Sequence, residues 1–230
     1  MTCRRMSVTR RGVRLITVAC ALAAVCGLAA CGGNQPAPSP SGQPQVLGVP
    51  GTLIMVIRHA EKPSAGNPAQ GIDAEGQPDT HSLTTVGWAR ARALTGLFDP
   101  AAGPVRRGLA RPAAIYAAGG SGGEGTRPRE TVQALADHLG IHEDTSYAKG
   151  DEAALVTHVA GLPGPTLISW QHEEIPAIAA AFGAVTPAPP TNWAGDRFDV
   201  VWTFTATTRG WNFAQVPEMV LPGDSSTALQ

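Results

Sequence analysis

The stretch LIMVIRHAE, from Leu53 to Glu61, decides the fold of this 230-residue chain. Its first five residues are apolar and rich in β-branched side chains, which is typical of a strand buried on both faces. Arg58 and His59 follow this run directly. In parallel sheets, functional sites form beyond the carboxyl ends of the strands. The stretch therefore predicts a buried parallel strand that delivers an arginine and a histidine to a site.

Further apolar runs follow along the chain, separated by helical patterns. They are 113–117, 166–170 and 198–204, and 211–216 is predicted to pair with the last of these as a hairpin across 207–210. Strands that alternate with helices predict a mainly parallel sheet covered on both faces. The expected fold class is a three-layer α/β/α sandwich.

Apolar residues at helical spacing predict four helices between these strands. The first presents one face made of Leu83, Val86, Arg90, Ala93, Leu94 and Leu97 and ends near Asp99. The second has Pro128 at its first position and Gly140 as its stop. The third is expected over 151–161 and the fourth over 175–182.

Residues 1–30 have the pattern of an export signal. Five arginines precede an uncharged apolar run that ends in Leu28-Ala29-Ala30-Cys31. Signal peptidases need small residues before the cleavage point, and the cysteine after them resembles a bacterial lipobox. We expect Cys31 to carry lipid and to anchor the chain to the outer face of the bacterial cytoplasmic membrane. A plain secretory signal or a membrane anchor is the alternative, and Arg10-Arg11 leaves twin-arginine export open.

The segment 31–50 is rich in Gly, Pro, Ser and Gln and poor in large apolar side chains. It is predicted to be a disordered tether, which leaves 51–230 as one folded domain. The other three cysteines fall inside the signal segment. The domain is therefore expected to have no disulfide, cysteine nucleophile or cysteine metal site.

The balance of charged residues indicates which classes of partner the chain can bind. Without the five arginines of the signal segment, the chain has 12 Lys and Arg against 18 Asp and Glu. This negative balance argues against nucleic-acid binding. A small anionic substrate remains compatible with it, because an anion pocket needs only local positive charge.

Two more polar residues follow the predicted strands. Arg127 comes after the second strand and a Gly-rich loop, 119–125, and His172 comes after the third strand. The carboxyl ends of parallel strands share one edge, so we expect both residues to meet Arg58 and His59 there. Arginine forks and helix N-termini suit phosphate oxygens. The sequence thus predicts a phosphate site.

These residues resemble the motifs of the histidine phosphatase superfamily, which has the phosphoglycerate-mutase-like fold. Arg58-His59-Ala60 stands at the end of the first strand, and Leu83-Thr84-Thr85-Val86-Gly87 opens the next helix. Arg127 lies four residues before Thr131, a spacing that favours it over Arg129, and His172 follows a later strand. The likeness runs from about Leu53 to Phe204.

The resemblance implies that His59 attacks phosphorus and forms a phosphohistidine. Arg58, Arg127 and His172 would hold the phosphoryl oxygens, and no metal or cofactor is needed. The implied reaction is hydrolysis of a small phosphomonoester. The alternative is a non-catalytic lipoprotein that binds a phosphorylated ligand or a partner through a degenerate site.

The general acid stays open at this point. Glu173, directly after the second histidine, and Glu152, in the region after Arg127, are equal candidates, and Glu61, beside His59, is the third. The segments 63–80 and 186–192 are expected to form the rim of the site. Their side chains are small and hardly basic, which argues against a highly charged substrate.

Overall fold

The computed structural model describes residues 45–64 and 69–230. The predicted signal segment, the predicted lipid site Cys31 and most of the predicted tether lie outside this range. Within it, no helix has the length and apolar character needed to cross a membrane.

Six strands in the described residues form one sheet, in the order β2-β3-β1-β5-β6-β4. Their bounds are β1 (Leu53–Arg58), β2 (Ala114–Ala117), β3 (Thr166–Trp170), β4 (Val185–Thr186), β5 (Val200–Thr207) and β6 (Gly210–Pro217). β1 pairs with β3, β3 with β2 and β6 with β4 in parallel, while β5 is antiparallel to both of its neighbours. The prediction of a mainly parallel sheet is confirmed.

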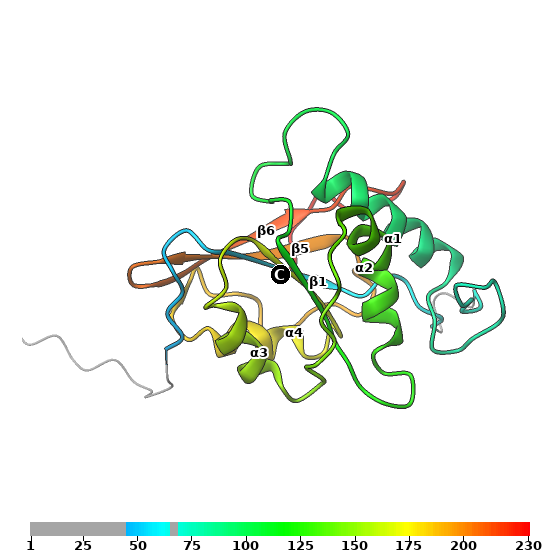
Figure 1. Ribbon diagram of the computed structural model, residues 1–230, viewed down its shortest axis with the longest axis horizontal. Helices are drawn as coiled ribbons and strands as arrows, with labels where there is room; N and C mark the ends of the chain where they lie inside the picture. The colour runs from blue at the N-terminus through cyan, green and yellow to red at the C-terminus, as the bar shows by residue number, and fades with distance from the viewer. Residues whose placement is uncertain (1–44, 65–68) are drawn as a thin grey trace, which may run out of the picture. The chain divides into compact units, whose positions relative to one another are not determined.

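The helices lie in two layers, one on each face of the sheet (Figure 1). In the described part of the chain they are α1 (Thr85–Phe98), α2 (Thr126–Leu139), α3 (Glu152–Val159) and α4 (Ile175–Ala181). The α1–α2 layer buries one apolar cluster with the sheet, and the α3–α4 layer buries the other. The predicted three-layer α/β/α sandwich is the observed architecture.

β1 shows why a continuous apolar run becomes the central strand. Successive side chains of a strand point to opposite faces. Ile54 and Val56 enter the cluster under α3 and α4, whereas Met55 and Ile57 enter the cluster under α1 and α2. Because both faces of β1 are covered by helices, every one of these positions has to be apolar.

Several predicted boundaries were wrong. The fourth strand begins at Val200 rather than Phe198, and the short strand β4 was missed. α2 begins at Thr126, so Pro128 is its third residue and not its first. Val86, predicted to lie on the apolar face of the first helix, is exposed on α1. The buried face of α1 is made of Gly87, Arg90, Ala91, Leu94, Leu97 and Phe98.

α1 packs closely against the loop that follows β1. The side chain of Thr84 caps the helix by accepting from the Gly87 amide at 3.2 Å. A Cβ atom on Gly87 would lie 2.4 Å from the carbonyl oxygen of Glu61. Only glycine therefore lets the first turn of α1 approach this loop.

We predict that Gly87→Ala lowers the free energy of unfolding by about 1–3 kcal/mol, because backbone rather than a flexible side chain blocks the new methyl group. Thermal unfolding measures this. Gly96→Ala is the matched control on the same helix, since a Cβ there meets nothing within 4 Å, and alanine should be neutral or stabilise by up to about 1 kcal/mol. Equal melting temperatures for the two variants would contradict the packing described.

Candidate functional site

The carboxyl edge of the sheet brings the predicted polar residues together. Arg58 ends β1, and His59 follows it with its backbone N–H donated to the Trp170 carbonyl at 2.9 Å. This bond keeps the start of the loop in register with β3. Arg127 lies in the first turn of α2, and His172 lies between β3 and α4.

The tautomer of His59 is fixed by its own loop. The Nδ1 atom lies 2.8 Å from the carbonyl oxygen of Ala60. A carbonyl oxygen only accepts hydrogen bonds, so Nδ1 must carry the proton and the lone pair belongs to Nε2. Burial lowers the pKa of His59 well below its usual value, and the positive charge of Arg58 lowers it further. The imidazole is therefore neutral at pH 7, as a nucleophile requires.

Arg58 is buried beside His59. Its Nη1 donates to the carbonyls of Gly195 at 2.8 Å and Arg197 at 3.0 Å, and its guanidinium carbon lies 3.7 Å from the centre of the Phe198 ring. Its Nε and Nη2 are buried without a partner among the described residues. Burial lowers the pKa of Arg58 to about 10, so it stays charged at pH 7. Unpartnered buried donors on a cation are suited to an anion.

The Thr131 hydroxyl connects the backbone of Arg127 to that of Ala60, the residue after His59. Its hydroxyl donates to the Arg127 carbonyl at 2.7 Å and accepts from the Ala60 amide at 2.8 Å. The Arg127 side chain donates to the carbonyls of Thr80 and Ser82. The charge of Arg127 also lowers the pKa of His59. Arg129, the alternative arginine, is exposed and lines a hollow beside the Gly-rich loop instead.

His172 and Glu173 follow β3 at the same edge of the sheet, and their side chains lie close together. The Nδ1 of His172 lies 3.0 Å from a carboxylate oxygen of Glu173, at an angle that leaves this nitrogen without a hydrogen bond. Burial lowers the pKa of His172, and the positive charge of Arg58 adds to this. Burial alone would raise the pKa of Glu173, but its own amide, His172 and Lys62 lower it overall.

Lys62 is a member of the site that the motifs did not predict. Lys62 is partly buried, and its pKa is lowered first by burial and then by Arg127 and Arg58, against the effect of Glu173. It makes no ion pair within 4 Å in the described part of the chain. Its place three residues after His59 was the available signal, because a loop of that length stays near the strand end.

The other two candidate acids are bound to structural partners. One carboxylate oxygen of Glu152 accepts from the Trp170 indole at 3.0 Å, and both accept from the Gly150 amide at 3.1 Å. Glu152 is not among the charged groups that most affect His59, Arg58 or His172. Glu61 is held by Arg90, with a shortest contact of 2.8 Å.

Arg90 lies at the centre of a buried ion cluster next to the site. Besides Glu61 it contacts Glu218 at 2.8 Å and Asp224 at 2.7 Å. Burial raises the pKa of Glu218 to about 8, and the carboxylates of Asp224 and Glu61 add to this effect while Arg90 opposes it. The cluster therefore holds a proton on Glu218 at neutral pH. The signal in the sequence was a charged residue on the apolar face of α1, where a partner is needed.

Chemically, the assembled group combines a neutral imidazole with three cations and one nearby carboxylate. The positive charge of such a group suits a dianion, and the free lone pair of the imidazole has the chemistry of a nucleophile. No set of three His, Cys, Asp or Glu residues within 45–64 and 69–230 is arranged to hold a metal ion.

Comparisons with known proteins leave the family of the chain unassigned. Searches by sequence found no matching protein family and no matching curated protein. Comparison of structures found 22 matching chains. One is the candidate phosphohistidine phosphatase SixA from Agrobacterium tumefaciens, with 17% sequence identity, a TM-score of 0.42, and coverage of 72% of this chain and 95% of that chain. At this distance the likeness does not assign a function.

The Arg90 cluster predicts a specific dependence of stability on pH. Folding raises the pKa of Glu218 from its ordinary 4.5 to about 8, so between these values the folded state holds a proton that the unfolded chain has released. This contribution to stability is complete below pH 4.5 and is lost as the pH rises to about 8. The loss is at most about 5 kcal/mol, since a tenfold change in proton affinity is worth about 1.4 kcal/mol.

Glu218→Gln removes the titrating group and keeps an acceptor for Arg90. Denaturant unfolding at several pH values should show a flatter decline for this variant than for the wild type, and a more stable variant at pH 9. Parallel curves for the two proteins would contradict the assignment of the proton to Glu218.

Proposed function

We propose that this chain hydrolyses phosphomonoesters through a phosphohistidine on His59. The observation that carries the proposal is the contact between His59 Nδ1 and the Ala60 carbonyl at 2.8 Å. It assigns the lone pair to Nε2 inside a group of cations. The resemblance of Arg58-His59, Arg127 and His172 to histidine phosphatase motifs supports the same reaction.

The proposed reaction has two displacements. His59 Nε2 attacks phosphorus, the bond from phosphorus to the ester oxygen breaks, and the departing oxygen takes a proton from Glu173. Water then attacks the phosphohistidine while Glu173 takes its proton, and this step releases phosphate and restores the neutral imidazole. Arg58, Arg127, Lys62 and His172 stabilise the charge on the equatorial oxygens.

Export and lipid attachment at Cys31 remain part of the proposal. A chain anchored in this way would meet phosphomonoesters outside the cytoplasmic membrane. Labelling of the expressed protein with a radioactive fatty acid, compared with Cys31→Ala, tests the anchor separately from the enzyme.

We predict that His59→Ala abolishes hydrolysis of an aryl phosphate, because alanine lacks the Nε2 lone pair that attacks phosphorus in the proposed reaction. A wild-type reaction quenched with detergent at alkaline pH should retain a phosphoryl label on the protein that is stable in alkali and lost in acid. His138→Ala is the control, since His138 lies on exposed α2 surface beside Asp99. Equal rates for wild type and His59→Ala would refute the proposal. If orthophosphate then still raised the melting temperature, the chain would be a phosphate-ligand binder.

We predict that the effect of Glu173→Gln depends on the leaving group. An alkoxide needs a proton as it departs, so the rate with an alkyl phosphate should fall roughly 10²- to 10⁴-fold. A strongly acidic phenol departs without that proton, so the first step with its phosphate should change little. Steady-state and single-turnover kinetics with both substrates measure this. Glu174→Gln is the neighbouring control, because Glu174 pairs with Lys149 at 3.0 Å. Equal losses with both substrates would remove Glu173 as the acid.

A further inference from the structure

The three residues from His59 to Glu61 are each held by a different part of the fold. The His59 amide donates to Trp170 of β3, and the Ala60 amide donates to Thr131 of α2. The Glu61 carbonyl accepts from the Thr84 amide at 2.9 Å, at the start of α1. The nucleophile loop thus has a separate backbone attachment at every residue.

The side chain of Glu61 is held as well, because its carboxylate accepts hydrogen bonds from Arg90. Arg90 Nε lies 3.0 and 3.2 Å from the two carboxylate oxygens, and Nη2 lies 2.8 Å from one of them. Glu61 follows Ala60, whose carbonyl accepts the His59 Nδ1 proton. That carbonyl belongs to the peptide between Ala60 and Glu61. A hold on the Glu61 side chain therefore limits rotation of the peptide that orients the imidazole.

Arg90 is itself fixed from the opposite side by the C-terminal segment 218–224. Its Nη1 donates to Glu218 at 2.8 Å and to Asp224 at 3.2 Å, and its Nη2 donates to Asp224 at 2.7 Å. Only 4% of the Arg90 surface is exposed. All three nitrogens donate, and each terminal nitrogen bridges two carboxylates. Only an arginine offers this planar pattern of donors.

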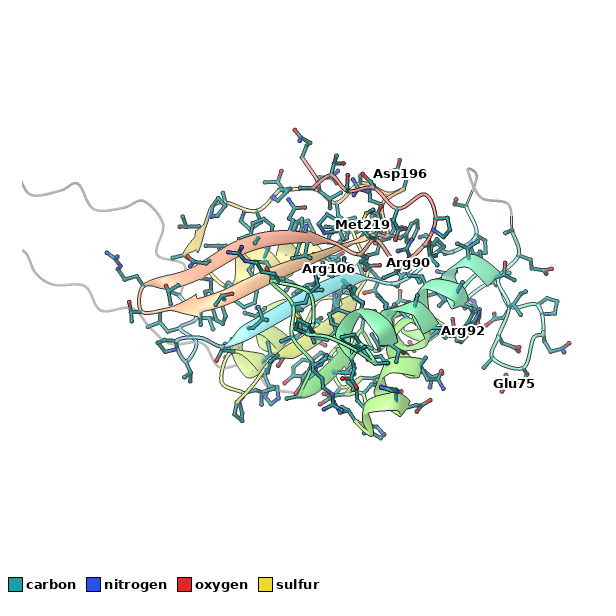
Figure 2. The ribbon with its side chains drawn as sticks, turned by 90° about the horizontal axis from the view of Figure 1, so that it is seen from above. Glu75, Arg90, Arg92, Arg106, Asp196 and Met219 are labelled. Atoms are coloured by element: carbon teal, nitrogen blue, oxygen red, sulfur yellow. The ribbon has the colours of Figure 1, made fainter. Side chains whose placement is uncertain are left out.

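The backbone of the C-terminal segment is strained where it reaches Arg90. Met219, directly after Glu218, has a φ of 47°, a left-handed conformation that is unfavourable for a residue with a side chain. Such a conformation persists only where surrounding contacts fix it. Arg106 donates to the carbonyls of Pro217 and Glu218 on one side, and Asp224 accepts from the amides of Val220 and Leu221 on the other. Figure 2 shows Arg90 next to Met219, where α1 meets this segment.

We propose that Arg90 is a positioning residue for His59, and that the C-terminal segment 218–224 is the anchor against which it acts. The proposal rests on the proposed phosphohistidine chemistry for its effect on rate. Every hydrogen bond of Arg90 to the described residues goes to Glu61, Glu218 or Asp224, so its action on His59 runs through Glu61 and the Ala60 carbonyl. It serves the orientation of the nucleophile and leaves phosphate binding to Arg58, Arg127, Lys62 and His172.

Arg90→Lys in the full chain tests this directly, because lysine keeps the charge and loses the planar donors. We expect kcat for an aryl phosphate to fall roughly 10- to 100-fold, since small errors in the position of a nucleophile are costly. The KM and the inhibition constant for orthophosphate should stay within about twofold of the wild-type values, because the residues proposed to bind the phosphate are unchanged. Asp224→Asn, a milder change to the anchor, should lower kcat in the same direction but less.

Leu94→Ala is the control for lost stability, because Leu94 is a buried apolar residue on the same helix. Below its melting temperature this variant should keep the wild-type kcat. The proposal is overturned if Arg90→Lys and Asp224→Asn both turn over at the wild-type rate. It is also overturned if Leu94→Ala loses kcat to the same extent as Arg90→Lys.

Nitrogen-15 NMR of histidine-labelled protein gives a readout that needs no turnover. The wild-type His59 signal, identified by its loss in His59→Gln, should be that of the Nδ1–H tautomer, and Arg90→Lys should shift it toward a mixture of tautomers. If the wild type is no faster than His59→Ala and the tautomer shift is seen, the proposed function fails and the positioning role stands. If the wild type is active and Arg90→Lys has an unchanged kcat and His59 signal, the positioning role fails and the proposed function stands.

Discussion

The hydrogen bond from His59 Nδ1 to the Ala60 carbonyl is the constraint on which the site depends. A neutral imidazole has one N–H and one lone pair, and this bond decides which nitrogen has which. Burial and the nearby cations keep the ring neutral. The bond is local, between adjacent residues, but its geometry is held from β3, α2 and α1 at once. The sheet and the helical layer of α1 and α2 therefore both hold the backbone around this peptide group.

Charge is segregated around this peptide group. Arg58, Lys62 and Arg127 influence His59 directly, whereas the acidic cluster of Glu61, Glu218 and Asp224 surrounds Arg90. Although the chain has more acidic than basic residues, the group around His59 is positive, because three nearby carboxylates pair with Arg90 instead. Because burial raises the pKa of Glu218 to about 8, this carboxyl keeps its proton at neutral pH and adds little negative charge to the cluster around Arg90.

Local pattern was enough to predict where β1, β2 and β3 end, to within one residue, because a buried strand needs a continuous apolar run and polar residues can follow only where it ends. Arg127 and Arg129 differ in their surroundings, because Arg127 donates to the carbonyls of Thr80 and Ser82 whereas Arg129 is exposed. The partners of Arg90 were beyond the reach of pattern. Glu218 and Asp224 lie 128 and 134 residues away along the chain, and only the fold of the C-terminal segment brings them to α1.

The three carboxylates considered as the general acid differ in what they are free to do. A general acid must release its proton to the leaving group and recover one from water, so it needs access to both. Glu152 is buried and Glu61 is partly buried, and the hydrogen bonds that they accept from the Trp170 indole and from Arg90 hold both carboxylates in place. Half of the Glu173 side chain is exposed, and it stands beside His172 and near Lys62. Because the pKa of Glu173 is lowered, only a small fraction of this carboxyl is protonated at neutral pH. The chemistry would then favour substrates whose leaving group needs little help, or an acidic medium in which Glu173 is protonated.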